Sequence, residues 1–236
     1  MSPPPFVTGL LQGNPIPCII PGHIQAKKGF HPDAASQIAN ALFHPAVEIV
    51  CHLLNGDLYS AHFLARKMQN DPWGQWLHSI LHRYEGDLCN SKAWTNGIDE
   101  VILAQCPLYH GESTSDQPAH ANAFMLIDQV GLSRRSLEPS FLRKQYGDKN
   151  IKWPGAAPTE DELVKEQRRL RDQEDGGVAE IDQKCWEEIC WLTHFLGDKY
   201  GWDQNTEGSM GYTESTEEQK EISRKMVGGG EGIRKF

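Results

Sequence analysis

The sequence predicts an all-α protein built from helical hairpins, and three observations support that fold class. Apolar residues recur every three or four positions over much of the stretch from 33 to 200, which is the spacing of an amphipathic helix. No segment shows the alternation of apolar and polar residues that is typical of a strand. Two helical segments are related by a repeat of about 30 residues, and each copy contains a Gly-Asp turn.

The first repeat unit is expected to hold two helices. Pro45 suits a first helical turn, because its fixed φ matches the helix and its missing N–H would be unpaired there anyway. Asn55 and Gly56 form a pair that ends helices, and Asp57 can cap the helix that follows. The apolar stripe of that second helix extends to Met68.

The second unit follows the same plan. Asp71 and Pro72 are a helix cap followed by a proline in the first turn, which is a strong start signal. Gly86 ends this helix, and Asp87 caps the next helix, which extends to about Gly97. The wide apolar face of the first helix consists of Trp73, Trp76, Leu77, Ile80, Leu81 and Tyr84.

The two units align residue by residue around their turns. The segment from His52 to Leu58 aligns with that from His82 to Leu88, and Ala61 falls on Ser91. A helix, a tight glycine turn and a second helix with a small residue are typical of tetratricopeptide-like repeats. Two such units are too few to bury a continuous core. The remaining helices, including a C-terminal packing helix, are therefore expected to cover them.

The rest of the chain is assigned from composition and from caps. We expect an extended Pro/Gly-rich arm over 1–32, a single helical domain over 33–200 and a disordered tail over 201–236. Within the domain, a short helix over 118–130 is followed by an irregular stretch over 131–158. A capping box at Thr159 and Glu162 then opens a charged helical segment, and the packing helix follows over 178–196.

Charge and hydropathy exclude some functions. The chain has 32 acidic and 23 basic residues and a formal net charge of −9, which argues against a general nucleic-acid binder. No apolar run is long enough to cross a membrane, and the N-terminus has no secretory signal pattern. We therefore expect a cytoplasmic protein with neither nucleic acid nor a membrane among its partners.

One helix stripe carries the candidate site. His78 and His82 are four residues apart, and Glu85 follows one turn later, so the three side chains share one stripe. Two imidazoles at this spacing can reach one divalent metal ion, with a carboxylate as a third ligand. The stripe adjoins the apolar face and is therefore expected to line a concave groove. The repeat register and the neighbouring helix add three more candidates, which are Glu48, His52 and His62.

The sequence leaves other functions open. The same residues can form a metal-free polar pocket for a small molecule, or a structural hydrogen-bond network. The alternative without chemistry is a tetratricopeptide-like module that binds a partner peptide in the groove. The chain lacks HExxH, P-loop, GxGxxG and GxSxG motifs, and it lacks the paired Glu-xx-His helices of a di-iron site. No catalytic residue is therefore assigned.

The segment from Leu77 to Asp87, with Asn90 and Trp94 after it, resembles a known family. This family consists of small uncharacterised proteins of fungi and some bacteria with the motif HG-I-x-H-R-x-E-x-D-x-x-N. The resemblance covers residues 43–97 and 178–200, and Ser79 stands where glycine is common. Some fungal members are similar to accessory proteins of metabolite (mycotoxin) pathways such as fusaric acid biosynthesis. The resemblance therefore implies a role in secondary-metabolite biosynthesis, and it implies no reaction.

Overall fold

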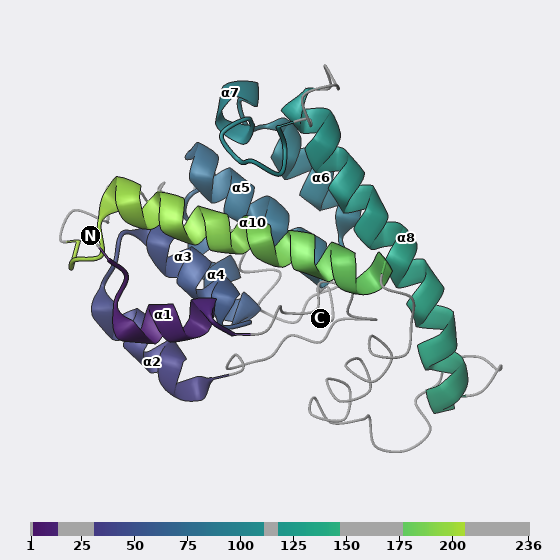
Figure 1. The fold of residues 1–236 in the computed structure, drawn as a ribbon, viewed down its shortest axis with the longest axis horizontal. Coiled ribbons are helices and arrows are strands. Elements are labelled where there is room, and N and C mark those ends of the chain that lie inside the picture. Colours follow the sequence, from purple (N-terminus) through teal and green to yellow (C-terminus); the bar gives the residue numbers. More distant parts are fainter. Residues whose placement is uncertain (1, 14–30, 111–117, 147–176, 206–236) are drawn as a thin grey trace, which may run out of the picture.

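The computed structural model describes residues 2–13, 31–110, 118–146 and 177–205 (Figure 1). All regular secondary structure in these ranges is helical, so the predicted all-α class is confirmed. Figure 1 shows one long helix, α10 (Gly177–Tyr200), lying across the shorter helices of the repeat units. None of the described helices combines the length and the hydropathy needed to cross a bilayer.

Two helix–turn–helix units form the centre of the molecule. Unit one consists of α3 (Pro45–Leu54) and α4 (Leu58–Ala65), and unit two consists of α5 (Pro72–Glu85) and α6 (Leu88–Asn96). The two helices of each unit pack against each other, and α4 and α3 also contact α5. The predicted boundaries are therefore close to the observed ones. The superhelical stacking of tetratricopeptide repeats remains a prediction.

The turns of both units have the same geometry. Gly56 and Gly86 adopt positive φ angles of 70° and 84°, which glycine adopts without a Cβ clash. The N–H of Asp57 donates to the carbonyl of His52, and the N–H of Asp87 donates to that of His82, both at 2.9 Å. These bonds are typical of a Schellman motif. The carboxylates of the same two aspartates then accept backbone N–H groups of α4 and α6.

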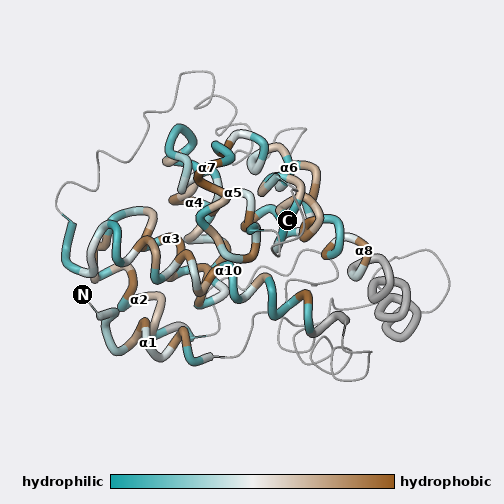
Figure 2. The backbone as a smooth tube through the Cα atoms, turned by 45° about the horizontal axis from the view of Figure 1, so that its top comes forward, coloured by the Kyte–Doolittle hydropathy of each residue, from teal (hydrophilic) through white to brown (hydrophobic). Residues whose placement is uncertain are grey.

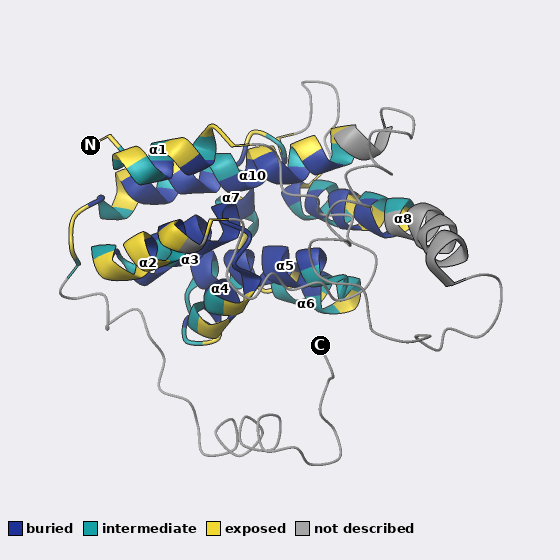
Figure 3. Cartoon of the chain, turned by 90° about the horizontal axis from the view of Figure 1, so that it is seen from below, coloured by how far each residue is buried: buried dark blue, intermediate teal, exposed yellow. Residues whose placement is uncertain are grey.

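The predicted C-terminal packing helix is confirmed as α10. It contacts α3 and α8, and its buried face includes Cys185, Ile189, Leu192 and Leu196. Most of α3 and α5 is buried (Figure 3), and hydrophobic residues are frequent along α3 (Figure 2). Trp76 and Leu77 of α5 are at most 1% exposed, as the width of their apolar face predicts.

The helix predicted over 118–130 is longer than expected. It is α8 (Ala119–Tyr146), which packs on α6 and on the short helix α7 (Glu100–Leu103). The prediction of an irregular stretch from residue 131 is therefore wrong as far as residue 146. The sequence misleads at Gly131, where a Cβ atom would lie 2.5 Å from Leu88. This glycine allows α8 to approach α6 closely, and it does not end the helix.

The ends of the chain also differ from the predictions. Within the predicted extended arm lies a helix, α1 (Pro5–Leu11), whose Val7 and Leu10 are buried. A second helix, α2 (Pro32–Ala41), starts at the end of that arm. At the other end Trp202 is buried and packs edge-on against Phe43, so the predicted disordered tail does not begin at residue 201. In both cases apolar side chains within a polar, Pro- or Gly-rich segment find a place in the core. The predicted arm over 14–30, the capping box at Thr159 and the tail over 206–236 lie outside the described residues.

Candidate metal centre

Three histidines come together between α4 and α5. His78 and His82 lie one turn apart on α5, and His62 approaches them from α4. One ring nitrogen from each residue can be chosen so that all three lie within 4.8 Å of one another. The sequence stripe therefore supplies two members of the group. The third member arrives because the last turn of α4 packs on α5.

The histidine group is buried. His62, His78 and His82 are 7%, 4% and 7% exposed, whereas the sequence placed them along an open groove. The ring of Trp94, from α6, stacks on His78 with a centroid separation of 4.2 Å. Packing of α6 against α5 thus covers a stripe that looks like the edge of the apolar face when α5 is considered alone.

Glu85 sets the orientation of His62. Its Oε1 lies 2.7 Å from Nδ1 of His62, and a carboxylate can only accept, so Nδ1 carries the proton. In the neutral ring the other nitrogen, Nε2, then presents a lone pair. The second oxygen of Glu85 lies 3.5 Å from Nδ1 of His82. Glu85 thus contacts two of the three histidines.

The lone pair of His62 points at the second histidine. Nε2 of His62 and Nε2 of His78 are 2.9 Å apart. Two nitrogens at this distance either share one proton in a hydrogen bond or face a common ion. Burial, followed in size by the charges of His62, His82 and Arg66, lowers the pKa of His78 to about 2. His78 is therefore a neutral imidazole, which is the form that binds metals.

The donor set fits a transition-metal ion. With Zn–N bonds of about 2.0–2.1 Å and tetrahedral angles, ligand nitrogens lie about 3.3 Å apart. The observed separation of 2.9 Å between two of the ring nitrogens is within small side-chain shifts of that value. Nδ1 of His78 is buried and has no hydrogen-bond partner among the described residues. A metal ion at either ring nitrogen of His78 is compatible with this arrangement.

Glu48 and His52 do not join this group. His52 lies between two carboxylates instead, with Nδ1 3.2 Å from Asp57 and Nε2 3.8 Å from Glu48. Burial lowers the pKa of His52, but hydrogen bonds and charges of Asp57 and Glu48 outweigh it and raise the pKa overall. Burial likewise raises the pKa of Asp57, and its bonds to His52 and Ser60 lower it overall. Of the six predicted residues, four converge and two form this separate ion-paired set.

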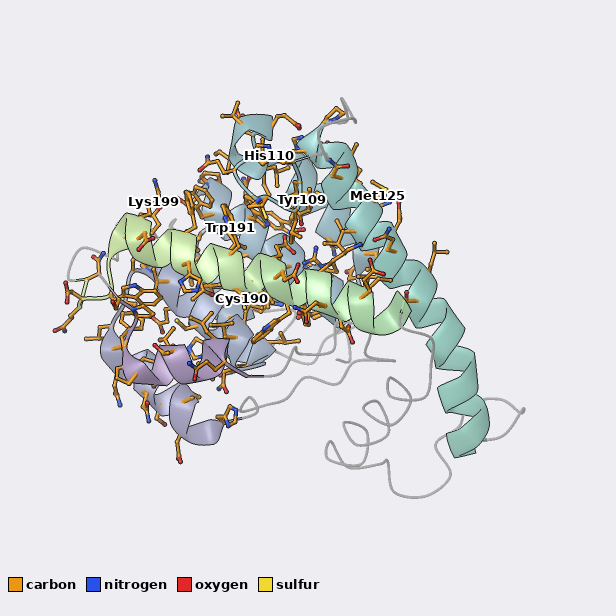
Figure 4. The ribbon with its side chains drawn as sticks, in the orientation of Figure 1. Tyr109, His110, Met125, Cys190, Trp191 and Lys199 are labelled. Carbon is orange, nitrogen blue, oxygen red and sulfur yellow. The ribbon has the colours of Figure 1, made fainter. Side chains whose placement is uncertain are left out.

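A second buried polar cluster was not predicted. Glu188 of α10 pairs with Arg83 of α5, and its Oε1 accepts from Trp76 Nε1 at 2.7 Å and from the Tyr109 hydroxyl at 2.6 Å. Figure 4 shows Tyr109 and Trp191 on the side of α10 that faces α5, and Trp191 packs on Trp76. The sequence signal for this pair is that Arg83 in α5 and Glu188 in α10 each lie beside the apolar face of their helix. The cluster joins α5 to α10, and Glu188 binds the side chains of the other three residues. We therefore interpret the cluster as structural.

Comparison with known proteins does not extend this description. No protein-family model, no curated protein and no solved structure matches the chain.

Proposed function

We propose that this protein binds one divalent transition-metal ion through ring nitrogens of His62, His78 and His82, with Glu85 holding His62 in the binding orientation. The observation that carries the proposal is the continuous contact from the Glu85 carboxylate through His62 to His78. The carboxylate fixes the proton on Nδ1 of His62, and Nε2 is left facing Nε2 of His78.

This arrangement is typical of metal sites. Histidine ligands commonly donate their second N–H to a carboxylate, which fixes the tautomer and makes the ligand more basic. Glu85 does this for His62. The three imidazoles of the group also lie together in one buried place, each residue at most 7% exposed.

The donor types narrow the choice of metal. Imidazole nitrogens suit zinc, copper, nickel, cobalt and iron, whereas calcium and magnesium require several oxygen ligands. The three ring nitrogens are accompanied by one carboxylate that is already engaged with two histidines. We therefore expect zinc or a neighbouring first-row ion, and no calcium or magnesium binding at this site.

The test is a titration of the chelator-treated protein with zinc, in which isothermal calorimetry measures the binding. The wild type is expected to bind one equivalent, and His78→Ala and His82→Ala are expected to lose that binding. Glu85→Gln is expected to weaken it by roughly 10- to 100-fold, the usual cost of removing a carboxylate that supports a histidine ligand.

The repeat offers a matched control. His52 occupies the position in unit one that His82 occupies in unit two, and its ring nitrogens lie beside Glu48 and Asp57. His52→Ala should therefore keep one equivalent of zinc. If the wild type binds no zinc, cobalt, nickel or copper, and His82→Ala merely lowers the melting temperature, then the histidines form a structural network and the proposal is wrong.

A further inference from the structure

We infer that the metal ion keeps one coordination position for water or a small monovalent anion. This inference rests on the proposed function, because it concerns the fourth ligand of the same ion. The ion would then have three protein ligands and one exchangeable ligand, as in catalytic zinc sites. A closed structural site would have four protein ligands.

The two carboxylates nearest the histidines are already engaged. Oε1 of Glu85 accepts from His62, and its Oε2 lies beside His82. Asp87, whose Oδ2 is 4.0 Å from His82, caps α6 and accepts from the side-chain amide of Asn90 at 2.6 Å. Either carboxylate would have to give up these contacts to become the fourth ligand. Three protein ligands are therefore the stable set.

The group is buried but not sealed. The side chains of His62 and His82 are each 9% exposed, so a small part of each remains open to solvent. Trp94 covers the ring of His78 by stacking on it. A fourth ligand would therefore enter along the edge formed by His62 and His82.

Charge selects the kind of ligand. Arg66 is an exposed residue one turn after His62 on α4, where its N–H donates to the His62 carbonyl. It is close enough to His78 to act on its pKa, after burial and the neighbouring histidines. A divalent ion together with Arg66 exceeds the negative charges of Glu85 and Asp87 by one. One hydroxide, azide or thiocyanate restores neutrality, whereas a dianion would overshoot it.

Water would hold the open position when no anion is bound. A zinc ion held by these three histidines would lower the pKa of that water to near neutral, so that it would release a proton to solvent. A small anion competes for the same position. Anion binding is therefore the direct measure of whether the position is open.

The experiment uses the cobalt-substituted full-length protein, because the visible spectrum of Co²⁺ reports its coordination. Titration with azide, and separately with thiocyanate, is expected to shift the spectrum with saturation. Arg66→Ala should weaken azide binding about threefold at low ionic strength, the size of a screened surface interaction, and it should not weaken cobalt binding, because the lost cation repels the divalent ion. Arg66→Lys should restore azide binding. The matched control is Lys67→Ala, which removes the adjacent cation and should change neither.

Two outcomes would overturn the inference, and they are distinguishable. If Co²⁺ binds but neither anion changes its spectrum, the fourth position is closed, and the proposed metal binding stands. If the chelator-treated protein binds no Co²⁺, both the inference and the proposed function fail.

Discussion

Units one and two share a backbone plan and use it for different chemistry. Both have a histidine in the last turn of the first helix, a glycine at positive φ and an aspartate that caps the second helix. Two of the positions that differ lie on the stripe of the candidate site. Unit one has Glu48 and Asn55 where unit two has His78 and Glu85.

These two exchanges decide the charge of each cluster. In unit one, His52 has two acidic neighbours, so its raised pKa favours the charged ring. In unit two, His78 has two histidine neighbours and is held neutral. Asn55 meanwhile bonds both the N–H and the carbonyl of His31, at 3.0 and 3.1 Å, and so anchors the start of α2. The two units therefore share a turn, and the residues around it decide whether a histidine is an ion-pair partner or a candidate metal ligand.

The units also differ where they meet α10. The positions of unit one that correspond to Trp76 and Arg83 are Ala46 and Leu53, which are apolar and buried. Unit one therefore has no charged side chain at these two positions. Unit two uses the buried pair of Arg83 with Glu188.

The largest expected effect comes from breaking that pair. Glu188→Ala should lower the free energy of unfolding by about 3–5 kcal/mol, because it leaves Arg83 as a buried charge without its counterion. Urea denaturation measures this change. The double variant Arg83→Met with Glu188→Leu should recover much of the loss, since apolar replacement of a buried pair is often neutral. A loss below about 1 kcal/mol for Glu188→Ala would show that solvent screens the pair.

The second effect is a pH dependence of opposite sign in the two units, measured without metal. His78 has a folded pKa of about 2 against a reference of 6.5. Below pH 6.5 the unfolded chain therefore binds a proton that the folded chain does not. Stability should fall by about 1.4 kcal/mol per pH unit from this residue. His78→Leu should show a correspondingly smaller slope between pH 6.5 and 4.5 in urea denaturation.

For His52 the sign is reversed. Its folded pKa is raised, so its contribution is fully present below pH 6.5 and is lost as pH rises through the folded pKa. The pKa of Asp57 is lowered, so its contribution is present above its unfolded value near 4 and is lost as pH falls through the folded pKa. The stability difference between wild type and His52→Leu should therefore shrink above neutral pH. A difference that grows there would contradict the ion-paired description of unit one.

The smallest effect compares the two caps. Asp57→Ala is expected to cost about 2 kcal/mol and Asp87→Ala about 1 kcal/mol, both within the range for lost N-caps. The difference arises because Asp57 is buried beside His52, whereas the side chain of Asp87 is 30% exposed. Thermal unfolding of both variants gives the comparison. Equal losses would mean that the contact with His52 adds nothing to the cap.

Local signals in the sequence determined the two units. Asp57, Asp71 and Asp87 marked helix starts, and Gly56 and Gly86 marked turns, because capping and positive φ depend on residues next to each other in the chain. The spacing of His78, His82 and Glu85 placed them on one stripe for the same reason. These features follow from the period of an α-helix and needed no knowledge of the neighbours.

Only the tertiary structure decided which candidates form one group. Packing of α4 on α5 brought His62 to His78, and Trp94 of α6 turned an expected groove into a buried site. Asp57 held His52 apart, although the repeat register made it equivalent to His82. The pairing of Arg83 with Glu188 joins residues 105 positions apart. Such contacts depend on how helices dock, and helix periodicity carries no information about the docking partner.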